Sequence, residues 1–188
     1  YQRRARSYDA QEDRQALGLA YPVVDGSGDM IYFTALGDIW SFQPSSKSLT
    51  QLTDDGFAEN GLALNADGTR LAYVGESLNG LDLRVMDLAS SEVEVLDLDA
   101  QNISVPAWSP DGSSLATFVD VPGNPLGGQL VVVNIETGEQ TRVLDPMPAQ
   151  PISWDETGAH IAITRLDPYS TRYREGMYEL VIAKVDSS

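Results

Sequence analysis

One local pattern recurs four times along the 188 residues of this chain and limits the folds that the chain can adopt. Each copy has an apolar stretch, a polar turn that ends in glycine, and then a run of alternating apolar residues. The turn glycines are spaced 40, 44 and 46 residues apart, at Gly28, Gly68, Gly112 and Gly158. A repeat of this length is typical of one blade of a β-propeller, and blades of this kind are stable only when they stack on one another.

The local chemistry of each copy predicts a short antiparallel sheet. Asp67-Gly68 and Asp111-Gly112 are hairpin signals, because glycine adopts positive φ without steric strain and aspartate tolerates the bend. The strand after the turn is expected over 31–34, 71–74, 115–118 and 161–164. Third and fourth strands follow at hairpin distance. The sequence therefore predicts an all-β chain built of four-stranded antiparallel blades.

A β-sandwich also contains many short strands, but it does not require the same pattern every 40-odd residues. We therefore expect a propeller, with 1–188 as one propeller domain or propeller fragment. The expected repeats are 15–56, 57–100, 101–147 and 148–188, with an outer strand and linker over 1–14. The last repeat has no fourth strand. Either the N-terminal segment completes that blade and closes a small ring, or the chain is part of a larger propeller, which we favour.

The composition excludes several classes of partner. Twelve Lys and Arg against 28 Asp and Glu give a net charge of −16, so neither nucleic acid nor an anionic membrane surface is an expected partner. No apolar run is long enough for a membrane span. The chain contains no cysteine and starts without a methionine, as a processed chain or a piece of a longer one would.

The stretch "AWSPDGSSLATF" at 107–118 resembles the TolB-type (WD40-like, PD40) propeller repeat, whose signature is W-S-P-D-G before an apolar strand. The stretches "RRARSYD", "IYFTALGDIW", "QLTDD" and "LDPYSTRYREGMYEL" also resemble the TolB-like propeller found N-terminal to the catalytic domain of large bacterial amidohydrolases. The resemblance implies an accessory propeller in an exported enzyme. It also implies a periplasmic or extracellular location in the bacterial envelope.

No site for reaction chemistry is expected in this chain. Amidohydrolase-type metal sites resemble an H-x-H pair with further ligands, whereas this chain has one histidine, His160, for which we expect a surface role. There is also no G-x-S-x-G elbow for a serine nucleophile. We expect no catalytic, metal or cofactor-binding residues. The acidic stretches "LDLDAQN" and "LTDDGFAEN" lack an EF-hand pattern and are interpreted as solvated turns.

The three tryptophans are expected to lie in the core. Trp108 and Trp154 occupy equivalent repeat positions on a first strand, which predicts packing between blades. Trp40 lies on a third strand, and we expect it to pack in the same way.

The stretch "RLDPYSTRYREGM" at 165–177 gathers scarce cations and phenols into what the sequence indicates is a loop. This stretch is one of two long connections between a second and a third strand. The other is "VDVPGNPLGGQ", and both are expected on the same rim of the propeller, where equivalent connections emerge. Arginine and tyrosine are enriched at protein interfaces. The expected partner-binding residues are Arg165, Tyr169, Arg172, Tyr173 and Arg174. The alternative is internal: the arginines pair with acidic neighbours and the tyrosines cover the end of a blade.

These observations predict a non-catalytic interaction module that docks on, or gates, the catalytic domain of an exported metal-dependent amidohydrolase. The alternatives are a free-standing TolB-like scaffold of the cell envelope and the propeller gate of a prolyl-oligopeptidase-like serine peptidase. The expected partners are proteins, with self-association through open blade edges as a further expectation. No cofactor is expected.

Overall fold

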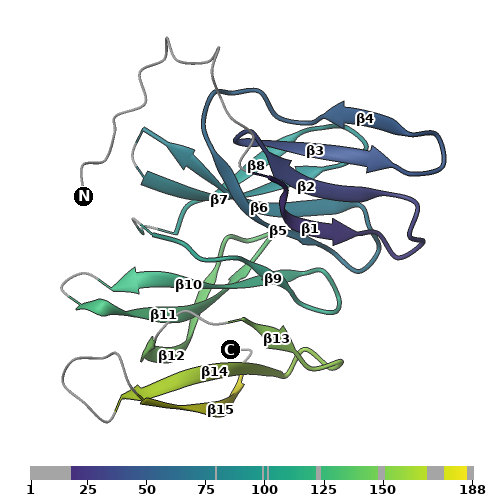
Figure 1. Ribbon diagram of the computed structural model, residues 1–188. Helices are drawn as coiled ribbons and strands as arrows, with labels where there is room; N and C mark the ends of the chain where they lie inside the picture. Colours follow the sequence, from purple (N-terminus) through teal and green to yellow (C-terminus); the bar gives the residue numbers. More distant parts are fainter. Residues whose placement is uncertain are drawn as a thin grey trace.

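A computed structural model gives the placement of residues 18–78, 80–98, 100, 102–121, 124–147, 151–168 and 176–185. Within these residues the chain forms fifteen strands and no helix (Figure 1). No described segment is therefore a helix long and apolar enough to cross a membrane. The strands form four antiparallel sheets that follow one another along the chain.

The first two sheets each have four strands in sequence order. Blade 1 comprises β1 (Ala20–Val24), β2 (Ile31–Ala35), β3 (Asp38–Gln43) and β4 (Ser48–Gln51). Blade 2 comprises β5 (Glu59–Leu64), β6 (Arg70–Ser77), β7 (Gly80–Asp87) and β8 (Val93–Leu96).

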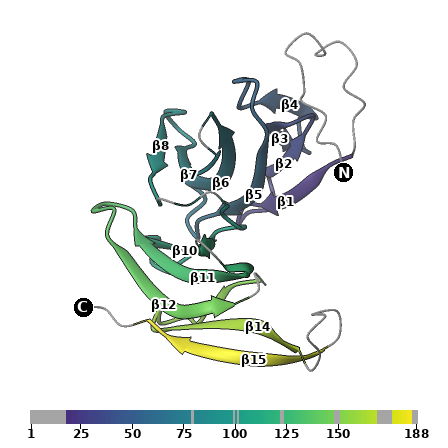
Figure 2. The same cartoon turned by 90° about the vertical axis from the view of Figure 1, so that its left-hand side faces the viewer.

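The third sheet also has four strands, and the fourth has three among the described residues. Blade 3 comprises β9 (Ala107–Trp108), β10 (Ser114–Val121), β11 (Asn124–Asn134) and β12 (Gln140–Met147). Blade 4 comprises β13 (Ser153–Trp154), β14 (His160–Pro168) and β15 (Gly176–Lys184). The four sheets stand side by side along an arc, each against the next (Figures 1 and 2), which is the arrangement of propeller blades and not of a two-sheet sandwich.

The hairpin between the first two strands of each blade has the same geometry in all four copies. The repeat glycine has a φ of +78°, +73°, +70° or +73°, in the left-handed region that glycine adopts without strain. A side chain three residues earlier accepts a hydrogen bond from a backbone N–H two residues after the glycine, at the start of the second strand or one residue before it. That side chain is Asp25, Asn65, Ser109 or Asp155. The sequence repeat is therefore a repeat of turn chemistry.

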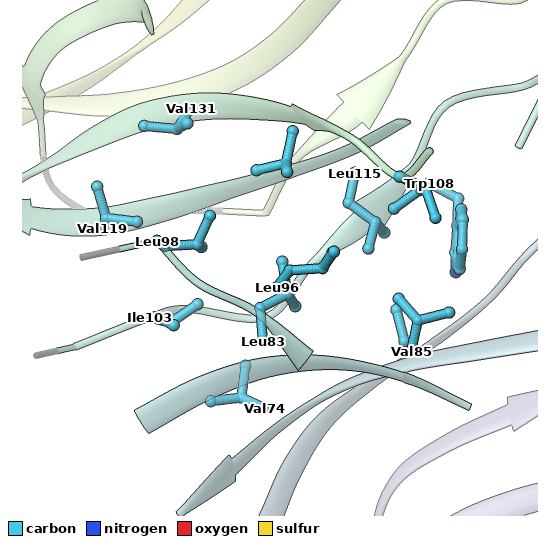
Figure 3. Packing of buried hydrophobic residues seen from close by; sticks show 13 residues of the cluster. Val74, Leu83, Val85, Leu96, Leu98, Ile103, Trp108, Leu115, Val119 and Val131 are labelled. Carbon is cyan, nitrogen blue, oxygen red and sulfur yellow. The ribbon is translucent and has the colours of Figure 1, made fainter. Parts of the chain in front are cut away.

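The core consists of three apolar clusters, one between each pair of neighbouring blades. The cluster between blades 2 and 3 joins Val74, Leu83 and Val85 to Leu115 and Val131 across the interface (Figure 3). Fully burying one such side chain contributes about 1.5–3 kcal/mol, so the contacts between blades, not within them, supply most of the apolar stabilisation.

The tryptophans differ in what they hold together. Trp108 and Trp154 lie at the interfaces and donate their indole N–H to the preceding blade, at Ala63 and Ala107 respectively. Their packing between blades is as expected. Trp40 belongs to none of the three clusters. Its neighbour Ile39 packs in the cluster between blades 1 and 2, so strand alternation turns Trp40 away from that interface, and its indole nitrogen donates to the Ala35 carbonyl of its own sheet, 3.0 Å away. The prediction that Trp40 packs between blades is therefore wrong.

Candidate functional site

The stretch predicted to be an arginine–tyrosine loop is largely a β-hairpin in this structure. β14 and β15 pair without interruption from His160↔Lys184 to Pro168↔Gly176, so 165–168 and 176–178 are strand. The prediction of a loop over the whole of 165–177 is therefore wrong, because the antiparallel ladder continues beyond the alternating apolar pattern. The same holds for "VDVPGNPLGGQ", where β10 and β11 pair out to Val121↔Asn124.

The two extended hairpins project on the same side of the molecule, at the left in Figure 1. Their strands have eight to eleven residues, whereas β2 and β3 of blade 1 have five and six.

Arg165 lies on β14 directly opposite Glu179 on β15, and the two side chains form a half-exposed ion pair. Cross-strand pairs of opposite charge stabilise a sheet by a few tenths of a kcal/mol up to about 1 kcal/mol. The other predicted partner-binding residues, Tyr169, Arg172, Tyr173 and Arg174, lie outside the described residues.

β15 carries large apolar side chains that face solvent, which the sequence reasoning missed. Met177, Tyr178, Leu180 and Ile182 are all exposed. Strand alternation places Tyr178, Leu180 and Ile182 on one face, because Val181 points the other way into the cluster between blades 3 and 4. The signal was present in the sequence: residues 180–183 of β15 are all apolar, as in a strand covered on both sides.

A polar cluster lies between blades 1 and 2, and the sequence reasoning missed it as well. Its centre is Glu59, the first residue of β5, which is 1% exposed. Glu59 Oε2 accepts a hydrogen bond from Thr53 Oγ1 at 2.9 Å, and Thr53 in turn accepts one from the Ile39 N–H of blade 1 at 2.8 Å. Glu59 Oε1 is buried and accepts no hydrogen bond from the residues that the structure describes. "LTDDGFAEN" is therefore not simply a solvated turn, and that interpretation is wrong for Glu59.

Burial raises the pKa of Glu59 to about 8, and the nearby charges of Asp55 and Asp38 act in the same direction. The hydrogen bond from Thr53 opposes the rise without cancelling it. Glu59 is therefore mostly protonated at neutral pH, and its carboxyl group can then donate to the Asp55 side chain.

Arg84 on β7 provides the positive charge of this cluster. Its guanidinium binds Asp55 at 3.0 Å and Asp82 at 3.4 Å, and it donates to the Glu76 carbonyl at 3.0 Å. Gly75 makes room for the Arg84 guanidinium, since a Cβ there would lie 2.8 Å from the guanidinium carbon.

Asp55 is the acidic partner of Arg84 in this cluster. Burial raises the pKa of Asp55, but the hydrogen bonds from the Phe57 N–H and from Arg84 outweigh burial, and the pKa is lowered overall. The cluster is a bridge between blades: a loop from blade 1 is tied to a strand of blade 2.

His160 lies at the start of β14, half exposed, with Nδ1 3.2 Å from Asp155 Oδ2. The backbone N–H of His160, the side chain of Thr157 and the imidazole lower the pKa of Asp155 to about 2. The pair belongs to the repeated hairpin turn. Among the described residues, no three histidine, aspartate or glutamate side chains gather as metal ligands would.

A groove of about 1000 Å³ lies between the outer parts of blades 2 and 3. It is acidic, because four carboxylates line it against one guanidinium: Asp87, Glu92, Glu94, Glu136 and Arg70. A neighbour in this groove would meet negative charge on both walls.

Comparison with protein-family models and with curated protein sequences gives no match for this chain. Solved structures do match. TolB from Acinetobacter baumannii superposes with a TM-score of 0.69 at 16% identity, over 88% of this chain and 40% of that one. A protein described as a TolB from Agrobacterium tumefaciens gives 0.71 at 13% identity, over 91% of this chain and 62% of that one. The tricorn protease gives 0.66 at 16% identity, over 90% of this chain and 15% of that one.

This chain thus spans less than two thirds of the length of each of these proteins. At such identities the likeness concerns the fold. Four stacked antiparallel sheets with one turn chemistry, superposing on TolB structures, make this chain a TolB-like β-propeller in fold.

Proposed function

We propose that this chain is a non-catalytic interaction module of an exported metal-dependent amidohydrolase, docking on its catalytic domain or gating access to it. The observation that carries the proposal is the β14–β15 hairpin, whose nine-residue strands pair without interruption from His160↔Lys184 to Pro168↔Gly176 and flank the arginine- and tyrosine-rich stretch 169–175 in the sequence. We also take 1–188 as one propeller domain, with the four repeats predicted from the sequence.

The chemistry of the hairpin supports a protein partner. Arg172 and Arg174 stand in the sequence beside Tyr169 and Tyr173, within a chain of net charge −16. Two cations against this acidic background would orient a carboxylate-rich patch of a partner, and the phenol rings would bury a flat apolar area. Arg165 is joined to Glu179 by an ion pair across the two strands of the same hairpin.

Amidohydrolase chemistry would reside in another domain. The resemblance of "LDPYSTRYREGMYEL" to the propellers of such enzymes supports this assignment, and one histidine does not make an H-x-H metal site. The expected location is the periplasm or the extracellular side of the bacterial envelope, in keeping with the likeness of the fold to TolB.

Two experiments test the proposal. The reading frame downstream of the Ser188 codon is read first, and an H-x-H-bearing barrel is the expected result. That domain and this chain are then purified separately and titrated in a calorimeter. Arg172→Ala with Arg174→Ala should weaken binding by about tenfold or more and leave the melting temperature unchanged.

The matched control is Arg70→Ala with Arg142→Ala, which removes the same charge from exposed residues of blades 2 and 3. The control should bind almost normally. If both pairs weaken binding equally, general electrostatics is responsible. If Arg172→Ala with Arg174→Ala lowers the melting temperature and spares binding, the segment is structural and the proposal fails.

A second candidate is a free-standing scaffold of the cell envelope, favoured by the superposition on TolB from Acinetobacter baumannii. A stop codon directly after Ser188 would select it. A G-x-S-x-G hydrolase domain downstream would instead select the propeller gate of a serine peptidase.

A further inference from the structure

We propose that the outer face of blade 4 is a docking surface for a further four-stranded blade of the same repeat class. The outer face consists of the side chains that point away from blade 3, namely Ala162 and Thr164 of β14 and Tyr178, Leu180 and Ile182 of β15. Leu180 is 68% exposed and Ile182 is 65% exposed. Strand alternation also places Lys184, the last residue of β15, on this side, so the apolar row of Tyr178, Leu180 and Ile182 ends in one charged residue. Contiguous apolar surface of this kind marks an interface.

The internal repeat shows what covers such a face. Thr164 and Phe118 each lie six residues after their repeat glycine, and they pair with Leu180 and Leu130 respectively. Leu180 is therefore the structural equivalent of Leu130, which is 0% exposed because blade 4 packs over it. By the same register Ile182 is the equivalent of Val132, which is 6% exposed. The outer face has the pattern of an interface that elsewhere in this chain is filled by a blade.

The backbone register also locates a hydrogen bond that the incoming blade would form. Ala63 and Ala107 lie opposite Ala72 and Ala116, and their carbonyl oxygens accept the indole N–H of Trp108 and Trp154. Ser153 lies opposite Ala162 in the same register. The Ser153 carbonyl is thus the position at which a docked blade would place an indole nitrogen.

The residues by which blade 4 docks on blade 3 define the chemistry of the occupant. They are Ile161 and Ile163 on the second strand and Val181 on the third, together with Trp154 on the first. A second copy of this chain, presenting its own blade 1, is a poorer fit. Phe33, the blade 1 equivalent of Ile163, is already buried, so that end of the arc is not an open counterpart.

A single thiol reports on the outer face directly, because the chain has no cysteine. Leu180→Cys is made in the full chain, and again in the full chain followed by a second copy of residues 148–188. The rate of alkylation by iodoacetamide should fall by about tenfold or more in the extended chain. The matched control is Met177→Cys, which is 73% exposed on the other face of the same strand and should react at the same rate in both proteins.

Replacing the tryptophan of the appended copy with phenylalanine removes the indole N–H and keeps most of the apolar body. This change should raise the alkylation rate of the Leu180→Cys thiol again by about fivefold. A second extension uses residues 101–147 in place of 148–188, in case one appended unit does not fold. Unchanged reactivity of the Leu180→Cys thiol in both extended chains would overturn the proposal. So would protection in the unextended chain that rises with protein concentration while light scattering shows a dimer, since a second copy would then be the occupant.

Discussion

The indole nitrogen of Trp108 donates to the carbonyl oxygen of Ala63 across 2.9 Å, from the first strand of blade 3 to the first strand of blade 2. Trp154 repeats the relationship one blade later, with Ala107 at 3.0 Å. Blade 2 has Leu64 at the equivalent position and is joined to blade 1 by the Glu59 cluster instead. The chain thus uses two different polar devices to fix how its blades stack.

Trp108→Phe should destabilise the chain by about 1 kcal/mol, because it removes one buried hydrogen bond and keeps most of the apolar body. Trp108→Ala should cost about 3–5 kcal/mol, because it also opens a cavity in the cluster between blades 2 and 3. Urea unfolding followed by circular dichroism measures both.

Trp40→Phe is the matched control, since the bond from Trp40 to Ala35 stays within one sheet. It should leave the contacts between blades 2 and 3 intact. Equal losses of protection at Ala63 in hydrogen exchange for Trp40→Phe and Trp108→Phe would contradict a role for Trp108 between blades.

Stability should fall as the pH rises from about 5 to about 8 because of Glu59. The pKa of Glu59 is about 8 in the folded state against 4.5 ordinarily, so in this window the folded state binds a proton that the unfolded state has lost. By linkage the free energy of unfolding decreases by up to about 1.4 kcal/mol for each pH unit, and the dependence disappears below the ordinary pKa. Urea unfolding at a series of pH values measures the slope.

Glu59→Gln is the test of that assignment, because the amide resembles the protonated carboxyl group in shape and is uncharged. The variant should be nearly as stable as the parent at pH 5 and more stable at pH 8. A slope that is unchanged in Glu59→Gln would show that another group is responsible.

Gly75→Ala should destabilise the chain by about 2 kcal/mol, because the new methyl group displaces the Arg84 guanidinium and breaks its largely buried pair with the more exposed Asp55. Arg84→Met should have an effect of similar size, and the double variant should lose little more than either single one. Gly26→Ala is the control, since no atom lies within 4 Å of a Cβ there. Additive losses in the double variant would mean that Gly75 does not act through Arg84.

Asn65→Ala should cost about 1–2 kcal/mol, because the buried side chain accepts hydrogen bonds from the N–H groups of Thr69 and Arg70 at 2.9 and 2.8 Å. Asn65→Asp keeps the acceptor that blades 1 and 4 use at this position, and should stay within about 0.5 kcal/mol of the parent. If Asn65→Asp is as damaging as Asn65→Ala, the shared turn chemistry is not what holds the hairpin.

Periodicity predicted most of the fold, because each blade repeats one local unit. The repeat glycines have the positive φ that the hairpin needs, and Trp108 and Trp154 lie between blades as their equivalent positions indicated. The all-β propeller class followed from that repetition.

What escaped prediction depends on contacts that are not periodic. In the sequence, Glu59 is one more acidic residue of the stretch "LTDDGFAEN". It becomes buried only because blade 1 packs on β5. The length of the β14–β15 hairpin was not predicted, because proline and charged residues at 165–168 are typical of a loop. In the structure these residues belong to β14, and Pro168 is its last residue, opposite Gly176. The partner-binding role of Arg165, Tyr169, Arg172, Tyr173 and Arg174 stays a prediction.

The most direct measurement is a nuclear Overhauser spectrum of the indole N–H protons, which tests whether neighbouring repeats stack side by side. The Trp108 indole proton should show contacts to Ala63, and the Trp154 indole proton the same contacts to Ala107, one repeat earlier in each case. Contacts that skip a repeat, as two sheets packed face to face would give, would contradict the propeller and every inference drawn from its register.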